Sequence, residues 1–409
     1  MPATLRAYRR PGTAFPPSAP PDGSGGAGVV PSTEDRAGSG GLWVWLGAGA
    51  GGWQNLGIVH RFSRAVVVGA LLALPVAATG CAEGRTEARP TVTMPSTSPP
   101  QPVPLTPKVA EHAFRTYVTD EDVARAAGDE RLALTWTSDG QSQLTAAEFR
   151  KAAYDGDPVQ RFVYGEPKLY VPKLKNAGYP QWFMVSVDRS VMGKSKSKRR
   201  ALMGFILRGP SDHWKLTIAS LLQPKAKEPK VVTDKNGYAT ALSSDDTSVL
   251  IRPRDVGGIQ ATIAAEGADS VAAKVMKPGD VTTGYYRAAR RAKKRAKAKD
   301  LTLQVVYTAT PFPYFGLRTE HGGGLIIYSL FRGTSLIAED PDTPKPEIPE
   351  EAEHLLDGTV EGNEVDTTST LHFVAYDPPR AKKGKQAKAQ VIADDGTVTK
   401  AATPPLKKP

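Results

Sequence analysis

A short apolar run that ends at the only cysteine of the chain limits where a folded part can begin. Val59 to Cys81 reads VHRFSRAVVVGALLALPVAATGC, with basic residues first, an apolar stretch next and small residues before the cysteine. This order is typical of a secretory signal with its cleavage site. The apolar stretch from Ala65 to Ala78 is shorter than the about 20 residues that a membrane-spanning helix needs. We therefore predict a lipoprotein signal peptide over residues 59–80.

The residues around Cys81 predict a lipid anchor. Ala78, Thr79 and Gly80 are small enough to form a signal peptidase site. Cys81 would then carry a diacylglyceryl group on its sulfur and an acyl chain such as palmitate on its amine, and two or more chains anchor a protein where one binds only marginally. We expect the protein at the extracytoplasmic face of the cell membrane. The alternative is a free thiol that follows a short core helix.

Three other segments have compositions that do not build a core. Residues 1–58 are dominated by Gly, Ala, Pro and Ser, so we predict that they are disordered and precede the true start of translation near Val59. A genuine leader is the alternative. Residues 81–106 are rich in Pro, Thr and Ser and predict an extended tether, and residues 402–409 predict a disordered tail.

Residues 107–224 combine helical and strand periodicities. Capping signals predict helices that start at Pro107, after Thr119 and at Ala146. Beyond Pro158 apolar residues alternate with polar ones in short runs separated by turn residues, which predicts an antiparallel sheet with one covered face. We expect an α+β domain in which two or three helices precede a meandering sheet.

Residues 231–401 repeat that order of elements. Val256 to Gly267 and Tyr285 to Lys299 predict helices, and strand-like runs return from Leu301 onward. The polar, Pro-containing stretch 225–230 predicts a boundary. We therefore expect two α+β domains of similar architecture.

Several stretches together resemble a family of uncharacterised lipoproteins from Streptomyces and related actinobacteria. Besides the signal and the tether, they are TDEDVARAAGDERLALTW, LTAAEFRKA, VYGEPKLYVP, YPQWF, GYATAL, TTGYYRAA and RTEHGGGLIIYSL, and the likeness covers nearly all of 108–401. That family has no known activity, so the resemblance implies a location and an architecture but no catalytic residues. The order of elements is also similar to tandem cystatin-like or nuclear-transport-factor-2-like (NTF2-like) modules, which does not fix a function.

Three motifs match catalytic or nucleotide-binding strings but lack the partners that those strings need. His321 to Gly324 matches an oxyanion-hole string, yet the chain has no Gly-x-Ser-x-Gly. Ser195 to Lys198 matches Ser-x-x-Lys but lies in a predicted solvated loop between Met192 and Ala201, and Gly193-Lys194-Ser195 lacks the first glycine of a phosphate loop. The histidines show no metal-ligand spacing. We therefore assign no catalytic residue, no metal and no cofactor.

The strongest charge signal is a basic stretch without any acid. Alanines between the cations favour a helix with a thin apolar stripe, which cannot be buried all round. We expect contact with anionic lipid headgroups or wall polymers, the alternative being solvated charges that only keep the surface soluble. Nucleic acid is the usual partner of such runs, but an exported protein does not meet it. The cations are Arg287, Arg290, Arg291, Lys293, Lys294, Arg295, Lys297 and Lys299.

These features favour a non-enzymatic binding or scaffold role at the cell envelope. The alternative is a small NTF2-like pocket enzyme, or a small-ligand-binding domain at the cell surface, using the aromatic residues of 107–224. The sequence leaves the ligand and the oligomeric state open.

Overall fold

The computed structural model describes residues 103–174, 178–340, 342–356 and 358–405, all within one compact unit. Residues 1–58, the signal 59–80 and Cys81 lie outside the described residues, so these predictions stay predictions. None of the helices in the described ranges is both long and apolar enough to cross a membrane.

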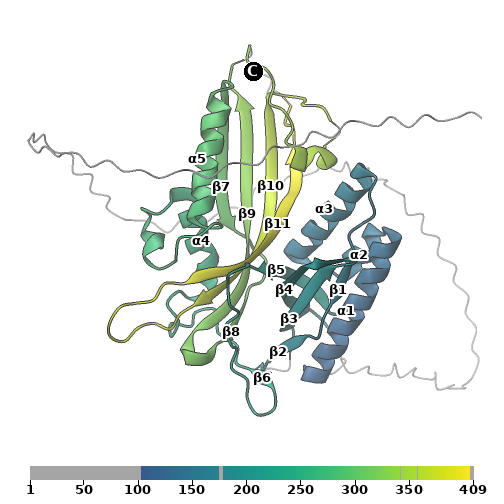
Figure 1. Ribbon diagram of the computed structural model, residues 1–409, viewed down its shortest axis with the longest axis vertical. Coiled ribbons are helices and arrows are strands. Elements are labelled where there is room, and N and C mark those ends of the chain that lie inside the picture. The colour runs from purple at the N-terminus through teal and green to yellow at the C-terminus, as the bar shows by residue number, and fades with distance from the viewer. Residues whose placement is uncertain (1–102, 175–177, 341, 357, 406–409) are drawn as a thin grey trace, which may run out of the picture. The chain divides into compact units, whose positions relative to one another are not determined.

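Three helices open the described chain, and five strands follow them (Figure 1). The Thr106 side chain accepts a hydrogen bond from the Val109 N–H and caps the first helix, as predicted, and Gly128 ends it with a φ of 65°. The elements are α1 (Pro107–Ala127), α2 (Glu130–Thr135), α3 (Asp139–Asp155), β1 (Phe162–Tyr164), β2 (Lys168–Pro172), β3 (Gln181–Val191), β4 (Lys194–Leu207) and β5 (Lys215–Leu222).

Three local predictions for this part are wrong. No helix starts after Thr119, because α1 continues and the Thr119 hydroxyl bonds the Arg115 carbonyl within it. The helix predicted from Ala146 begins at Asp139, and Thr145 is buried in its interior rather than capping it. The predicted loop 194–200 is the start of β4, whose pairing with β3 reaches Val191 and leaves only a tight turn.

The second part of the chain again places helices before the long strands. The predicted end of a helix at Gly267 is confirmed, and His321–Gly324, the string that matched an oxyanion hole, lies in a turn between two strands. The helices and strands are β6 (Tyr238–Ala239), α4 (Val256–Glu266), α5 (Thr283–Lys297), β7 (Leu301–Ala309), β8 (Phe315–Arg318), β9 (Gly324–Ala338), β10 (Glu364–Asp377) and β11 (Gln390–Ala402). Short 3₁₀ turns are η1 (Pro253–Asp255), η2 (Val271–Lys274), η3 (Glu320–Gly322) and η4 (Glu350–Leu355).

One 11-stranded sheet runs through both parts in the order β6-β2-β3-β4-β5-β11-β10-β9-β7, with β1 on β3 and β8 on β9. All neighbours are antiparallel except β2 and β6. The α+β class is confirmed as a large, mainly antiparallel sheet with few helices. The last strand, β11, lies between β5 and β10 (Figure 1).

Few backbone pairs join the two parts of the chain, but the two parts share a large hydrophobic core cluster. Strands β5 and β11 pair through Leu222–Ala393 and Leu221–Asp394. One core cluster takes buried residues from both parts, and the rings of Trp182 and Phe315 stack 4.8 Å apart across it. The division into domains 107–224 and 231–401, and their likeness to cystatin-like or NTF2-like modules, stay predictions.

Candidate functional site

Helix α5 packs along β7 at one edge of the sheet (Figure 1), and its sequence explains its shape. After Tyr285 and Tyr286 every apolar residue of α5 is an alanine. Because residues three and four apart share a helix face, Tyr285, Ala289, Ala292 and Ala296 lie together. That face turns toward the sheet, and beyond Tyr285 only alanine methyl groups project from it.

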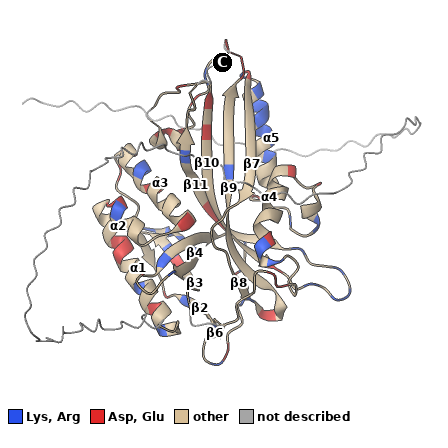
Figure 2. Cartoon of the chain, turned by 180° about the vertical axis from the view of Figure 1, so that it is seen from behind, with Lys and Arg blue, Asp and Glu red and all other residues tan. Residues whose placement is uncertain are grey.

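The eight predicted cations of the basic stretch are all exposed, and they divide between two faces. Arg295 and Lys299 line a groove beside the sheet, whereas the other six do not. Figure 2 shows basic residues along the length of α5. The outward cations are Arg287, Arg290, Arg291, Lys293, Lys294 and Lys297.

Few of these cations have a partner in the described ranges. Lys299 lies 3.3 Å from Glu347, Arg287 donates to the Thr283 hydroxyl at 3.1 Å, and the Arg290 guanidinium lies 5.8 Å from the centre of the Tyr286 ring. No other ion pair joins them to a described carboxylate. The structure therefore presents a row of charges that the described protein does not neutralise.

Two further basic clusters, at residues 194–200 and 382–388, are partly engaged in the fold. Lys198 and Arg200 lie 2.9 and 3.0 Å from Asp188, and Arg199 donates to backbone carbonyls at the end of β5. In the loop before β11, Lys388 donates to the Ala273 carbonyl. Helix α5 is thus the stronger candidate surface.

The groove beside α5 has a volume of about 1020 Å³. Its walls are the alanine face of α5 and the segment 344–351, and its floor is the adjacent face of β7 and β9. Side chains two apart in a strand share a face, so Leu301, Leu303 and Val305 line the floor together, with Leu336 from β9. The cavity exists because the alanines of α5 are too small to fill the space above these side chains.

One cation lies at the floor of the groove. Arg332 of β9 stands opposite Tyr307 of β7, and its Nη2 donates to the Ser369 hydroxyl at 2.9 Å. Its Nε is buried and has no hydrogen-bond partner, and no ion pair joins it to a described carboxylate. Arg332 is therefore a half-buried charge without a counter-ion.

Two stacked tyrosines close this end of the groove. The rings of Tyr285 and Tyr307 lie 5.6 Å apart. Burial raises the pKa of each hydroxyl, the negative charge of Asp394 raises the pKa of Tyr285 further, and the positive charge of Arg332 only partly opposes this. Both tyrosines therefore stay neutral at physiological pH and do not balance the charge of Arg332.

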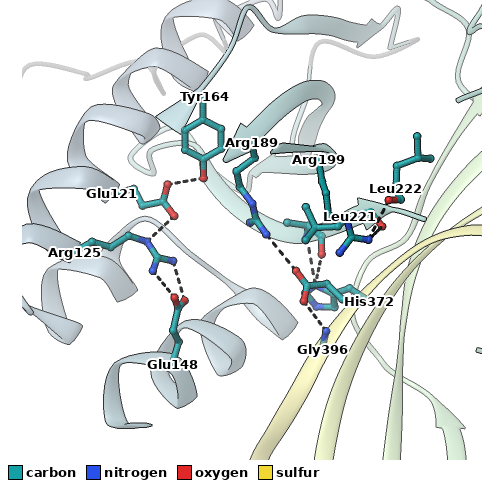
Figure 3. Close-up of polar contacts among 12 residues, drawn as sticks. Glu121, Arg125, Glu148, Tyr164, Arg189, Arg199, Leu221, Leu222, His372 and Gly396 are labelled. Carbon is teal, nitrogen blue, oxygen red and sulfur yellow. Dashed lines mark hydrogen bonds and ion pairs between the residues drawn. The ribbon is translucent and has the colours of Figure 1, made fainter. Parts of the chain in front are cut away.

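A second polar cluster, between α1, α3 and β1, is saturated (Figure 3). Arg125 lies 3.0 Å from Glu121 and 2.7 Å from Glu148, and Tyr164 donates to Glu121 at 2.7 Å. Burial alone would lower the pKa of Arg125, but the two carboxylates raise it above its ordinary value. With its donors occupied, also by the Gln160 carbonyl, this cluster holds elements together.

His372 is the one histidine of the described chain that is fully buried. Burial lowers its pKa to about 4, so the ring is neutral. Its Nδ1 lies 3.3 Å from the backbone nitrogen of Ala219, while its Nε2 has no partner (Figure 3). In the described chain no three His, Cys, Asp or Glu side chains gather as metal ligands would.

The aromatic residues of 107–224, for which we predicted mainly a core role with a ligand pocket as the alternative, pack against one another. Phe183 and Tyr170 are fully buried, and the Phe183 ring stacks on Phe205 at 4.9 Å and meets the edge of Trp214. The groove under α5 was not predicted. Its sequence signal was present, as alanines at helical spacing followed by the alternating strand Leu301 to Val305.

Comparisons with known proteins agree with the resemblance seen in the sequence. A family model described as "Domain of unknown function (DUF8094)" matches residues 100–403. An uncharacterized lipoprotein of Streptomyces avermitilis is 26% identical over 300 residues, which are 69% of this chain and 82% of that protein. Two uncharacterized lipoproteins of Streptomyces coelicolor are 26% and 28% identical, over 57% and 63% of this chain and 71% and 73% of their own lengths. No solved structure matches.

Proposed function

Since the chain belongs to the family of domains of unknown function DUF8094, and its relatives are named lipoproteins, we propose that it is a lipoprotein anchored in the cell membrane. The proposed anchor is Cys81, exposed by cleavage after Gly80, and the proposed location is the extracytoplasmic face. Changing Cys81→Ser should release the protein from washed membranes and remove the mass of the lipid. An unchanged mass in the membrane fraction would refute the anchor.

The proposed role is non-enzymatic binding at the envelope, and the outward face of α5 is the observation that supports it. Like charges four residues apart, such as Arg287 with Arg291 and Arg290 with Lys294, each destabilise a helix by about 0.2–0.5 kcal/mol. A partner of opposite charge bound along the helix would compensate this repulsion. Anionic lipid headgroups are the partner that an anchor at Cys81 would bring nearest.

The helix dipole accounts for only part of this charge. Cations in the last turn of a helix are stabilised by its carbonyl end, which covers Lys294, Arg295 and Lys297. The effect fades within one turn, and so it does not explain Arg287 and Arg290. The earlier cations of α5 therefore carry the argument for an external partner.

Vesicle binding tests this role. The compact unit from Val92 to Pro409 should co-sediment with phosphatidylglycerol vesicles at low salt and lose them at high salt, because the Debye length falls from about 10 Å at 0.1 M to about 3 Å at 1 M. Each cation near an anionic surface contributes roughly 1 kcal/mol, so replacing four outward cations should weaken binding at least tenfold. The variant is Arg290→Gln, Arg291→Gln, Lys293→Gln and Lys294→Gln.

A matched control removes the same charge elsewhere. Four exposed lysines outside α5, replaced by Gln, should leave vesicle binding close to that of the parent. Equal losses in both variants, or no binding by the parent at low salt, would leave the α5 surface without a role. Binding to isolated wall polymers but not to vesicles would show that the partner of α5 is the polymer and not the lipid. The control lysines are Lys225, Lys227, Lys235 and Lys274.

A further inference from the structure

The groove under α5 is built differently from an ordinary contact between a helix and a sheet. Interiors are packed to high density, and a helix normally reaches the sheet with large apolar side chains. Here the alanines of α5 face Leu303, Val305 and Leu336, and all three of these remain partly exposed. On the opposite wall Ile348 is also only partly buried. Each is apolar surface that an apolar occupant would remove from water.

The shape of the groove suits an extended occupant. It runs beside α5 from Tyr285 to Lys299, and at 1.5 Å per residue this corresponds to about 21 Å. Its volume of about 1020 Å³ is at the upper end of the roughly 300–1,000 Å³ of small-molecule pockets. A long acyl chain fits these dimensions, and each buried methylene adds about fourfold to its affinity.

The polar end of such an occupant is set by Arg332. A guanidinium that is half-buried and lacks a counter-ion favours a carboxylate or phosphate, with which it forms paired hydrogen bonds. Its Nη2 donates to the Ser369 hydroxyl, and its buried Nε has no hydrogen-bond partner. The neutral Tyr285 and Tyr307 lie beside it and offer no competing charge.

The rim of the groove explains why the anionic end belongs at the floor. Four exposed acids line the rim together with three exposed cations, and exposed charges are screened by water and salt. These rim charges nearly balance one another, whereas Arg332 at the floor forms no ion pair with a described carboxylate, although Asp394 lies near enough to raise the pKa of Tyr285. The exposed acids are Asp300, Glu347, Glu350 and Glu351, and the exposed cations are Arg295, Lys299 and Lys345.

We propose that this groove binds one long-chain amphiphile with an anionic head, the acyl chain lying between the alanines of α5 and the strands β7 and β9, and the head pairing with Arg332. This goes beyond the proposed role of α5 at a surface. The two sites use opposite faces of the helix, and none of the four cations replaced in the vesicle experiment lines the groove. Either proposal can fail while the other stands.

The test uses the full chain with Cys81→Ser, freed of lipid, and three probes titrated in the calorimeter below their micelle concentrations. They are palmitate, 1-palmitoyl lysophosphatidylglycerol and uncharged hexadecanol. One molecule of at least one anionic probe should bind per chain, at least tenfold more tightly than hexadecanol. The tighter of the two anionic probes then assigns the head as a carboxylate or a phosphodiester.

Variants locate the binding. Ala292→Leu fills the centre of the groove and should weaken the tighter anionic probe at least tenfold, whereas Ala298→Leu makes the same change outside the groove lining and should not. Arg332→Gln should abolish the preference over hexadecanol. The four Gln substitutions of the outward face should leave this binding unchanged. Circular dichroism of each variant confirms its folding.

Several results would overturn the proposal. Equal binding of hexadecanol and both anionic probes to the parent needs no variant and removes the role of Arg332. If the folded Ala292→Leu variant binds the anionic probe as tightly as the parent does, the groove is not the binding site. Loss of binding in the outward-face variant would place the probe on the surface of α5. If the probes bind only after residues 1–91 are deleted, a segment of those residues would be the occupant of the groove in place of a lipid.

Discussion

At the scale of single residues, Gly140 shows how closely α3 approaches the sheet. A Cβ at this position would lie 2.4 Å from His372 Nε2, and His372 is fully buried and cannot move away. Gly140→Ala should therefore lower the free energy of unfolding by about 1–3 kcal/mol, the usual cost of overpacking. Urea denaturation of the parent and the variant measures it.

A second glycine provides the control. Gly258 is exposed in α4, and a Cβ there would meet no atom within 4 Å. Gly258→Ala should stabilise the protein by about 0.5–1 kcal/mol, since alanine loses less backbone entropy in a helix. If both substitutions shift the urea midpoint in the same direction, contact with His372 is not the reason that position 140 requires glycine.

Asp377 should make stability depend on pH. Burial raises its pKa to about 7, and although the Ile251 N–H bonds its Oδ2 at 3.0 Å, its Oδ1 has no partner. The unfolded chain releases this proton near pH 4, whereas the folded chain keeps it until about pH 7. Stability from this group is therefore present at low pH and is lost as the pH rises from 4 to 7, by up to about 4 kcal/mol.

The variant Asp377→Asn isolates that effect. His372, whose pKa is lowered to about 4, changes stability in the opposite sense between pH 4 and 6.5, so the parent's own profile mixes the two groups. The stability of Asp377→Asn relative to the parent should rise from pH 4 to about pH 7 and then level off in urea titrations. A constant difference across this range would show that Asp377 is ionised in the folded chain.

At the scale of elements, two ion pairs on α1 have the same spacing but differ sharply in burial. Arg125 and Glu121 are four residues apart with side chains 5% and 10% exposed, and Arg115 and Glu111 have the same spacing with 55% and 46% exposed. Arg125→Met would leave Glu121 and Glu148 without their cation and should cost about 3–5 kcal/mol. Arg115→Met should cost less than about 1 kcal/mol.

Thermal or urea unfolding of both variants compares these costs. The double variant Arg125→Met with Glu121→Gln should recover part of the loss, because it removes one stranded carboxylate along with the cation. Similar small losses for Arg115→Met and Arg125→Met would mean that the buried cluster does not join α1 to α3.

Elements with local signals were predictable from the sequence, and elements set by distant contacts were not. The cap at Thr106 and the alanine-rich α5 depend on neighbouring residues, and both predictions are confirmed. Thr145 and Glu148 match a capping box, but contacts with distant parts of the chain bury Thr145 inside α3 and place Glu148 on Arg125. The groove could not be predicted, because its width depends on how far α5 stands from β7.

At the scale of the whole molecule, the shared core predicts one cooperative unfolding transition for the described chain. The cluster around Trp182 and Phe315 takes buried residues from both sides of the joint, so neither side can keep its core when the other unfolds. All six tryptophans lie at or before Trp214. Tryptophan fluorescence thus reports only the first part, whereas circular dichroism reports both.

The two signals should change at the same urea concentration. The compact unit from Val92 to Pro409 is the sample of choice, because it contains the whole described sheet. Two separate midpoints would instead support independent domains at 107–224 and 231–401.

The place of β11 has a consequence for how the chain is made. The last strand of the described sheet in chain order, β11, is not at an edge of that sheet but between β5 and β10. Until residues 390–402 emerge, those two strands have open edges, which are the surfaces through which sheets pair with the wrong neighbour. A premature stop codon or a proteolytic cut that removes this segment would thus split the described sheet at its centre and expose the edges of β5 and β10 to aggregation.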